Sequence, residues 1–208
     1  MSNFAPLRAP LWQGLRHSRV SDRLRGLVTC GLAAMLALLV PVAHNPALAD
    51  GGGFVSEIKG GVLAHDVPDL WSGFQLETDA PDINVEVIFA RYMPFLGGRL
   101  HPALGASINT GGGTSHAYLD ARWQFDLTPS LFIGLGIGAA VHDGETGPTE
   151  PDMKALGSRL LFHFPVEVGF RLDPHNSISV YFEHISNGYT QDVNEGLDRL
   201  GVRYGYRF

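Results

Sequence analysis

Apolar and polar side chains alternate with a period of two residues in eight separate segments of the chain, and this pattern restricts the possible folds more than any other feature. The period is that of a β-strand, in which successive side chains point to opposite faces. The segments are residues 54–64, 83–91, 99–109, 117–125, 131–138, 159–171, 177–186 and 199–208. No run in this region approaches the 18 or more apolar residues of a membrane-spanning helix. The sequence therefore predicts an all-β protein.

The length and charge of these segments favour a membrane barrel over a soluble sandwich, which also alternates. Most segments have about ten residues, the length of a transmembrane β-strand. Their non-apolar faces carry many charges, too many for a dry core but suited to a hydrated, salt-bridged lumen. These charged residues are Arg159, Glu167, Arg171, Glu183, Arg199, Arg203 and Arg207. We predict an eight-stranded antiparallel transmembrane β-barrel over residues 50–208.

The connections between the predicted strands give the orientation of the barrel. With the N-terminal end of the first strand in the periplasm, the longer connections, such as 66–81, 142–157 and 187–197, lie outside. The periplasmic connections are short, with a turn predicted at 93–98, as in bacterial outer-membrane barrels. The terminal aromatic Phe208 resembles the assembly signal of such barrels. Pro165 cannot donate a ladder hydrogen bond, so we expect a bulge there.

Residues 1–49 have the features of a cleaved secretory signal peptide. Four arginines between 16 and 25 precede an apolar stretch, and Ala47-Leu48-Ala49 forms a small-x-small cleavage site. The alternative, a single transmembrane anchor, is disfavoured because the apolar stretch is short and ends in prolines. Cys30 is the only cysteine and lies in this segment, so we expect no disulfide in the mature protein. The location predicted from these features is the outer membrane of a Gram-negative bacterium.

The charge of the predicted mature chain argues against a nucleic-acid partner. Removing residues 1–49 takes away five arginines and one aspartate, which gives (15 − 5) − (21 − 1) = −10 with histidine neutral. Such an acidic surface repels phosphate backbones. The sequence also contains no metal-ligand spacing and no phosphate-binding glycine loop, so we predict no metal and no cofactor.

A histidine, a serine and an aspartate with the chemistry of a hydrolase share one face of the last two predicted strands. His184 and Ser186 continue the apolar stripe of strand 177–186, which would face lipid, and Asp198 has the outward parity of the last strand. A serine becomes nucleophilic when a base lies within hydrogen-bond reach and a carboxylate orients that base. Alternatively, His and Ser are simply tolerated in the headgroup region. Trp71, Trp123 and Tyr92 fit the aromatic belts at the membrane interfaces. His101 and His163 have the parity of the lumen, so we expect them to be hydrogen-bonded there.

The segment His184-Ile185-Ser186-Asn187-Gly188, with Asn194-Glu195-Gly196-Leu197-Asp198 downstream, resembles the PagL family of lipid A 3-O-deacylases over about 25 C-terminal residues. The resemblance implies Ser186 as nucleophile, His184 as base and Asp198 as the orienting acid. It also implies Asn187 as an oxyanion-hole donor, beside a backbone N–H around Tyr189. The family acid is usually Glu, so Glu195 is an alternative acid.

The resemblance implies a specific activity for the predicted barrel. The protein would be an outer-membrane serine esterase that removes the 3-O-linked 3-hydroxyacyl chain from lipid A of lipopolysaccharide. Its partner would be lipopolysaccharide in the outer leaflet, and a homodimer is possible. The alternative is a small non-enzymatic outer-membrane barrel that serves adhesion, structure or minor transport. No feature supports a third option, an acyltransferase.

Overall fold

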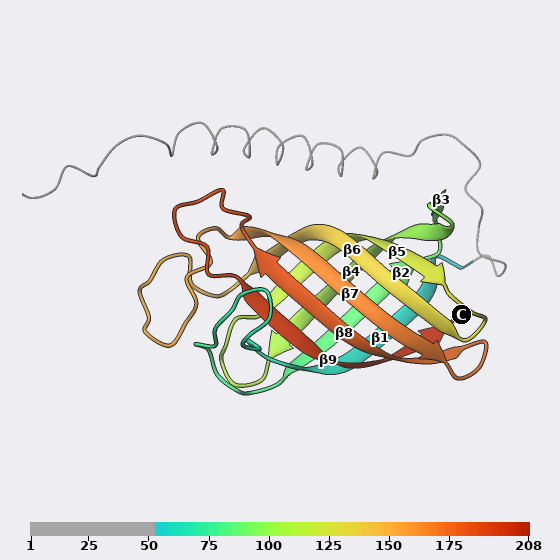
Figure 1. The fold of residues 1–208 in the computed structure, drawn as a ribbon, viewed down its shortest axis with the longest axis horizontal. Coiled ribbons are helices and arrows are strands. Elements are labelled where there is room, and N and C mark those ends of the chain that lie inside the picture. The colour runs from blue at the N-terminus through green and yellow to red at the C-terminus, as the bar shows by residue number, and fades with distance from the viewer. Residues whose placement is uncertain (1–52) are drawn as a thin grey trace, which may run out of the picture.

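The computed structural model describes residues 53–208, so the predicted signal peptide lies outside the described residues. Residues 53–208 form no helix that is long and apolar enough to cross a membrane. Nine antiparallel strands follow one another along the chain (Figure 1). They are β1 (Val55–Ala64), β2 (Asp82–Phe89), β3 (Met93–Phe95), β4 (Gly98–Asn109), β5 (His116–Asp126), β6 (Leu131–His142), β7 (Leu160–Arg171), β8 (Asn176–Ser186) and β9 (Leu197–Arg207).

Eight of these strands close into a barrel, which confirms the predicted fold. Each pairs with its sequence neighbours, β1 pairs with β9, and β2 pairs with β4. The short β3 is the difference from the prediction of a plain turn at 93–98. It folds back on the start of β4 as a hairpin, with Leu96 and Gly97 at positive φ angles of 46° and 75°. A two-residue hairpin turn of type I′ requires positive φ angles at both of its central residues.

The outer wall of the barrel is apolar. Large aliphatic side chains on most of its strands are about half exposed, as expected for residues that contact lipid. They include Ile83, Val85, Leu104, Ile108, Leu135, Ile137, Val166, Val168, Ile178, Val180 and Val202. The alternation seen in the sequence is therefore the alternation between lipid and lumen.

The lumen is filled by a network of charged side chains, as predicted. Glu167 lies at its centre and accepts hydrogen bonds from Lys59 at 2.9 Å and from Arg122 at 2.8 Å. Arg203 lies 2.8 Å from the same carboxylate and 2.7 Å from Glu86. All five side chains are buried, so their charges are balanced by one another rather than by water.

Pro165 interrupts the ladder between β6 and β7 without shifting it. Leu135 pairs with Val166 and Gly138 pairs with His163, which is the same register on both sides of the interruption. The predicted bulge is therefore wrong. The missing N–H of proline removes pairing locally, but no extra residue is inserted.

The four longer connections lie together at one end of the barrel, at the left of Figure 1. They are residues 65–81, 110–115, 143–159 and 187–196. Short turns join the strands at the opposite end. The C-terminal end of β8 and the N-terminal end of β9 therefore lie beneath the long connections.

Candidate active site

The antiparallel register of β8 and β9 brings the predicted histidine and aspartate face to face. His184 is the direct pairing partner of Asp198, and the histidine Nδ1 lies 2.5 Å from the aspartate Oδ1. The histidine Nε2 lies 2.9 Å from Ser186 Oγ. With the Nδ1–H donated to the carboxylate, Nε2 carries the lone pair and accepts the serine hydroxyl. The three side chains thus form a continuous chain of hydrogen bonds.

A loop covers these side chains, although they follow the outward parity of β8. The exposed fractions of His184 and Ser186 are only 4% and 7%, whereas Val180 on the same face is 54% exposed. The indole of Trp71 stacks flat on the His184 imidazole, with 4.4 Å between ring centroids and 12° between planes. The site therefore faces outward from the barrel wall but is sheltered beneath residues 65–81, the first external loop.

The residue after Trp71 holds the second oxygen of the aspartate. Ser72 donates to Asp198 Oδ2 from its backbone N–H at 2.6 Å and from its hydroxyl at 2.9 Å. The buried Lys154 ammonium donates to Ser72 Oγ at 3.3 Å and lies 2.7 Å from Asp66. Ser72 therefore links Asp198 on β9 to Lys154 in the distant loop 143–159.

Asn187 and Glu195, the other two predicted site residues, hold loops together in this structure. Asn187 Nδ2 donates to the carbonyls of Leu156 at 2.8 Å and Val193 at 2.6 Å. Glu195 accepts the backbone N–H of Ala155 at 2.6 Å. The side-chain N–H groups of Asn187 are thus engaged, and the carboxylate facing His184 is that of Asp198.

The chain turns sharply directly after Asn187. Gly188 and Tyr189 both have φ angles of 61°, and no acceptor for either backbone N–H is found within residues 53–208. Successive backbone N–H groups in a turn can form a concave site that binds an anion. This pair lies next to Ser186, where the sequence predicted a backbone oxyanion donor.

Sequence reasoning missed the contribution of the first external loop. Trp71 was expected in an interfacial belt, and Ser72 and Lys154 carried no recognisable signal. Both Ser72 and Lys154 act through contacts with residues more than 70 positions away, and loops of this length have no periodicity to reveal such contacts.

The loop is fastened to the barrel rim by a second histidine between two carboxylates. His65 Nδ1 lies 2.8 Å from Asp82 and its Nε2 lies 2.9 Å from Glu77. Burial opposes protonation of His65, but these two hydrogen bonds outweigh it and raise its pKa. Burial likewise opposes ionisation of Glu77, but hydrogen bonds from His65, Thr114 and Lys154 lower its pKa to about 2. The loop is therefore held by charged groups.

Comparison with known proteins identifies the family. Residues 97–207 match the family described as lipid A 3-O-deacylase (PagL). The chain belongs to the PagL family. The match covers the strands from β4 to β9, including His184, Ser186 and Asp198. It confirms the resemblance seen in the sequence and the predicted enzyme class, a hydrolase that acts on lipid A.

Two individual proteins extend the PagL likeness over most of the chain. Lipid A deacylase PagL of Bordetella bronchiseptica is 29% identical over 194 residues, which cover 89% of this chain and 95% of the relative. The crystal structure of the outer membrane enzyme PagL superposes with a TM-score of 0.53 at 19% identity, covering 74% of this chain and all of that one. The second comparison supports the barrel fold.

Proposed function

We propose that this PagL-family barrel is an outer-membrane serine esterase that removes the 3-O-linked 3-hydroxyacyl chain from lipid A. The observation that carries the proposal is the hydrogen-bonded chain from Asp198 through His184 to Ser186 on the outward side of the wall. The apolar outer wall supports a position within the outer membrane. The choice of the 3-position rests on the family.

Each step of the proposed reaction has a residue to perform it. His184 Nε2 takes the Ser186 proton while the serine oxygen attacks the ester carbonyl, and Asp198 stabilises the resulting imidazolium. The imidazolium then protonates the departing sugar oxygen, which leaves an acyl-enzyme on Ser186. Water, deprotonated by His184, attacks the acyl-enzyme and releases a 3-hydroxy fatty acid. Serine and histidine return to their starting states.

The oxyanion formed in these steps needs hydrogen-bond donors beside Ser186. The backbone N–H groups of Gly188 and Tyr189 are suited to this role because neither has an acceptor within residues 53–208 and both closely follow Ser186 in the chain. The side chain of Asn187 could contribute only after releasing Leu156 or Val193. We therefore assign the oxyanion contact to the backbone of this turn, with Asn187 holding the turn in place.

The neighbouring strand offers an apolar surface for the substrate acyl chain. Phe162 and Phe164 on β7 pair directly with Ser186 and His184, so their rings lie on the same outward side. Phe164 also contacts the Trp71 ring, with 5.5 Å between centroids. An acyl chain already in the outer leaflet can lie along these rings without being transferred into water.

The test is mass spectrometry of lipid A from a Gram-negative host that expresses this chain or its Ser186→Ala variant. The wild type should remove one 3-hydroxyacyl mass and the variant should remove none. Both barrels must be shown to be folded by their heat-dependent migration in gels. Unchanged lipid A from a folded wild-type barrel, in membranes and again in detergent, would contradict the proposal and favour a non-enzymatic barrel.

A further inference from the structure

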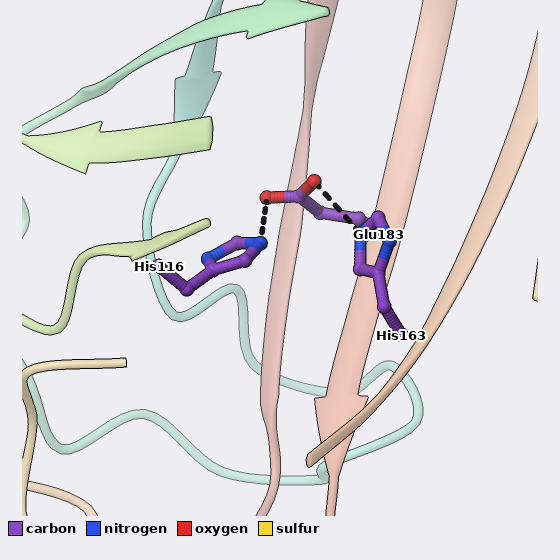
Figure 2. A group of neighbouring side chains, drawn as sticks. All are labelled: His116, His163 and Glu183. Atoms are coloured by element: carbon purple, nitrogen blue, oxygen red, sulfur yellow. Dashed lines mark hydrogen bonds and ion pairs between the residues drawn. The ribbon is translucent and has the colours of Figure 1, made fainter. Parts of the chain in front are cut away.

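The lumen contains a second group of histidine and carboxylate side chains, separate from the candidate active site. His116 on β5, His163 on β7 and Glu183 on β8 are all buried, and one ligand atom from each lies within 4.8 Å of the others (Figure 2). His163 Nε2 lies 3.1 Å from Glu183 Oε2, and His116 Nε2 lies 3.6 Å from Glu183 Oε1. Figure 2 shows the carboxylate between the two imidazoles.

His116 is the group that demands an explanation. It is buried, yet neither of its ring nitrogens has a hydrogen-bond partner among residues 53–208. Leaving a buried polar atom unpaired costs about 1–3 kcal/mol. Its Nε2 points at the carboxylate of Glu183 from just beyond hydrogen-bond distance (Figure 2).

His163 is oriented as a metal ligand would be. Asp120 lies 2.9 Å from its Nδ1 and accepts the proton of that nitrogen, so Nε2, which lies 3.1 Å from Glu183, is the nitrogen that would bind an ion in place of its own proton. Metal-ligating histidines commonly donate their other nitrogen to a carboxylate in this way. The negative charges of Asp120 and Glu183 would offset those of a divalent cation.

We propose that His116, His163 and Glu183 bind one divalent transition-metal ion of the Zn²⁺ type. Two imidazoles and a carboxylate form a ligand set that such ions favour, with water as the fourth ligand. Four-coordinate Zn²⁺ keeps its ligand atoms about 3.3 Å apart, close to the two distances to Glu183. Small rotations of the imidazoles would complete the site. The ion would link three strands across the lumen.

Other polar groups also contact Glu183 and would share its carboxylate with the ion. Ser107 donates to its Oε1 at 2.6 Å and Tyr181 donates to its Oε2 at 3.1 Å. Arg199 lies 3.8 Å from the carboxylate, but its guanidinium is also bonded to Asp82. The hydroxyls orient the carboxylate without adding charge, so they are compatible with a bound ion.

The test uses Co²⁺, whose visible absorption reports four-coordinate binding. The untagged mature barrel in detergent is titrated after chelation, and a second sample is refolded from urea with Co²⁺ present so that slow entry cannot hide the site. We expect one ion per barrel, competed by Zn²⁺. Absence of the absorption in both samples would overturn the proposal.

Variants identify the ligands. His116→Gln or His163→Gln should weaken Co²⁺ binding at least 100-fold, and Asp120→Asn should weaken it about 10- to 100-fold. The matched control is His101→Gln, another buried histidine whose Nδ1 is bonded to Phe89 and which is not in the group. Binding that survives loss of His116 and His163 in folded barrels would refute this ligand assignment.

A separate observation concerns the loop over the candidate active site. We infer that Trp71 and Ser72 are positioning residues for the proposed hydrolysis, and this inference rests on the proposed function. The flat indole fixes the plane of the His184 ring, and the two donors of Ser72 fix the Asp198 carboxylate. The Ser72 contacts hold Asp198 where it reaches the imidazole.

This inference predicts a change in kcat rather than in KM, because Trp71 stacks on His184 and Ser72 bonds to Asp198. Ser72→Ala should lower kcat about tenfold with KM nearly unchanged, and Ser72→Thr should restore it. Trp71→Ala should act similarly, with Trp71→Phe intermediate. If the wild type deacylates, Ser186→Ala is inactive and the Ser72 and Trp71 variants match the wild type, only the positioning role fails. An inactive wild type would instead refute the proposed function.

Discussion

Two histidine–carboxylate pairs lie on opposite sides of the same barrel wall, and they differ in their third partner. Outside, His184 and Asp198 are 2.5 Å apart and lead to the hydroxyl of Ser186. Inside, His163 and Asp120 are 2.9 Å apart and lead to the carboxylate of Glu183. An imidazole can take a proton from a hydroxyl and create a nucleophile, but a carboxylate offers it only a charge. In the proposed function the outer pair therefore serves catalysis, whereas the inner pair links strands of the lumen.

The strongest test of this contrast is removal of the outer imidazole. His184→Gln should lower the deacylation rate about 10⁴-fold or more, because the serine loses its base. The rate is measured with purified lipid A in detergent micelles. His101→Gln, which changes a lumen histidine outside both groups, should retain the wild-type rate. Equal rates for His184→Gln and His101→Gln would remove any special role of the outer pair.

The next largest effect is expected at the outer carboxylate. Asp198→Asn keeps the shape of the side chain but no longer orients and stabilises the imidazolium, so the rate should fall about 10²- to 10⁴-fold. The control is Asp126→Asn, whose side chain pairs with Arg99 and Arg171 at the other end of the barrel. A Glu195→Gln variant that loses as much activity as Asp198→Asn would reopen the assignment of the acid.

Changes inside the lumen should alter stability instead of rate. Glu167→Gln leaves Arg203, Arg122 and Lys59 facing one another without their shared anion, so the free energy of unfolding should fall by about 3–5 kcal/mol. Unfolding in urea, followed by gel migration, measures this change. The deacylation rate per folded barrel should stay near the wild-type value. A large loss of rate in barrels that remain folded would show that the two sides are coupled.

The smallest effect is expected at the contact between His65 and Glu77, which holds the first external loop on the barrel rim. The pKa of Glu77 is lowered to about 2 in the folded loop, so its stabilising contribution is complete above about pH 4.5 and is lost as the pH falls toward 2. Cleavage of the loop by pepsin should therefore accelerate as the pH falls through this range, after correction for the enzyme's own pH dependence. Glu77→Gln should flatten that dependence. Parallel curves for both proteins would exclude Glu77 as the fastening group.

The barrel and the outer pair could be predicted from the sequence because both follow from strand periodicity. Alternation assigns each side chain to lipid or lumen, and antiparallel pairing places the end of one strand beside the start of the next. Parity alone thus places Phe182, His184 and Asp198 on one side. The lumen charges followed from the same parity.

The loop contacts and the inner group could not be predicted in this way. Ser72 is separated from Asp198 by 126 positions, and only the folded loop brings them together. The side chains of His116, His163 and Glu183 come from three strands and follow no ligand spacing along the chain. Asn187 was assigned by resemblance, and its bonds to Leu156 and Val193 depend on loop packing that periodicity does not describe.

The pairing of β1 with β9 determines when the candidate active site is completed during folding of the barrel. Trp71 and Ser72 follow β1, whereas His184 and Asp198 belong to the last two strands, and β1 meets β9 only when the barrel closes. Before closure the chain contains Ser186 and His184, but Trp71 does not yet stack on His184 and Ser72 does not yet bond to Asp198. The candidate active site is therefore complete only once the barrel has closed.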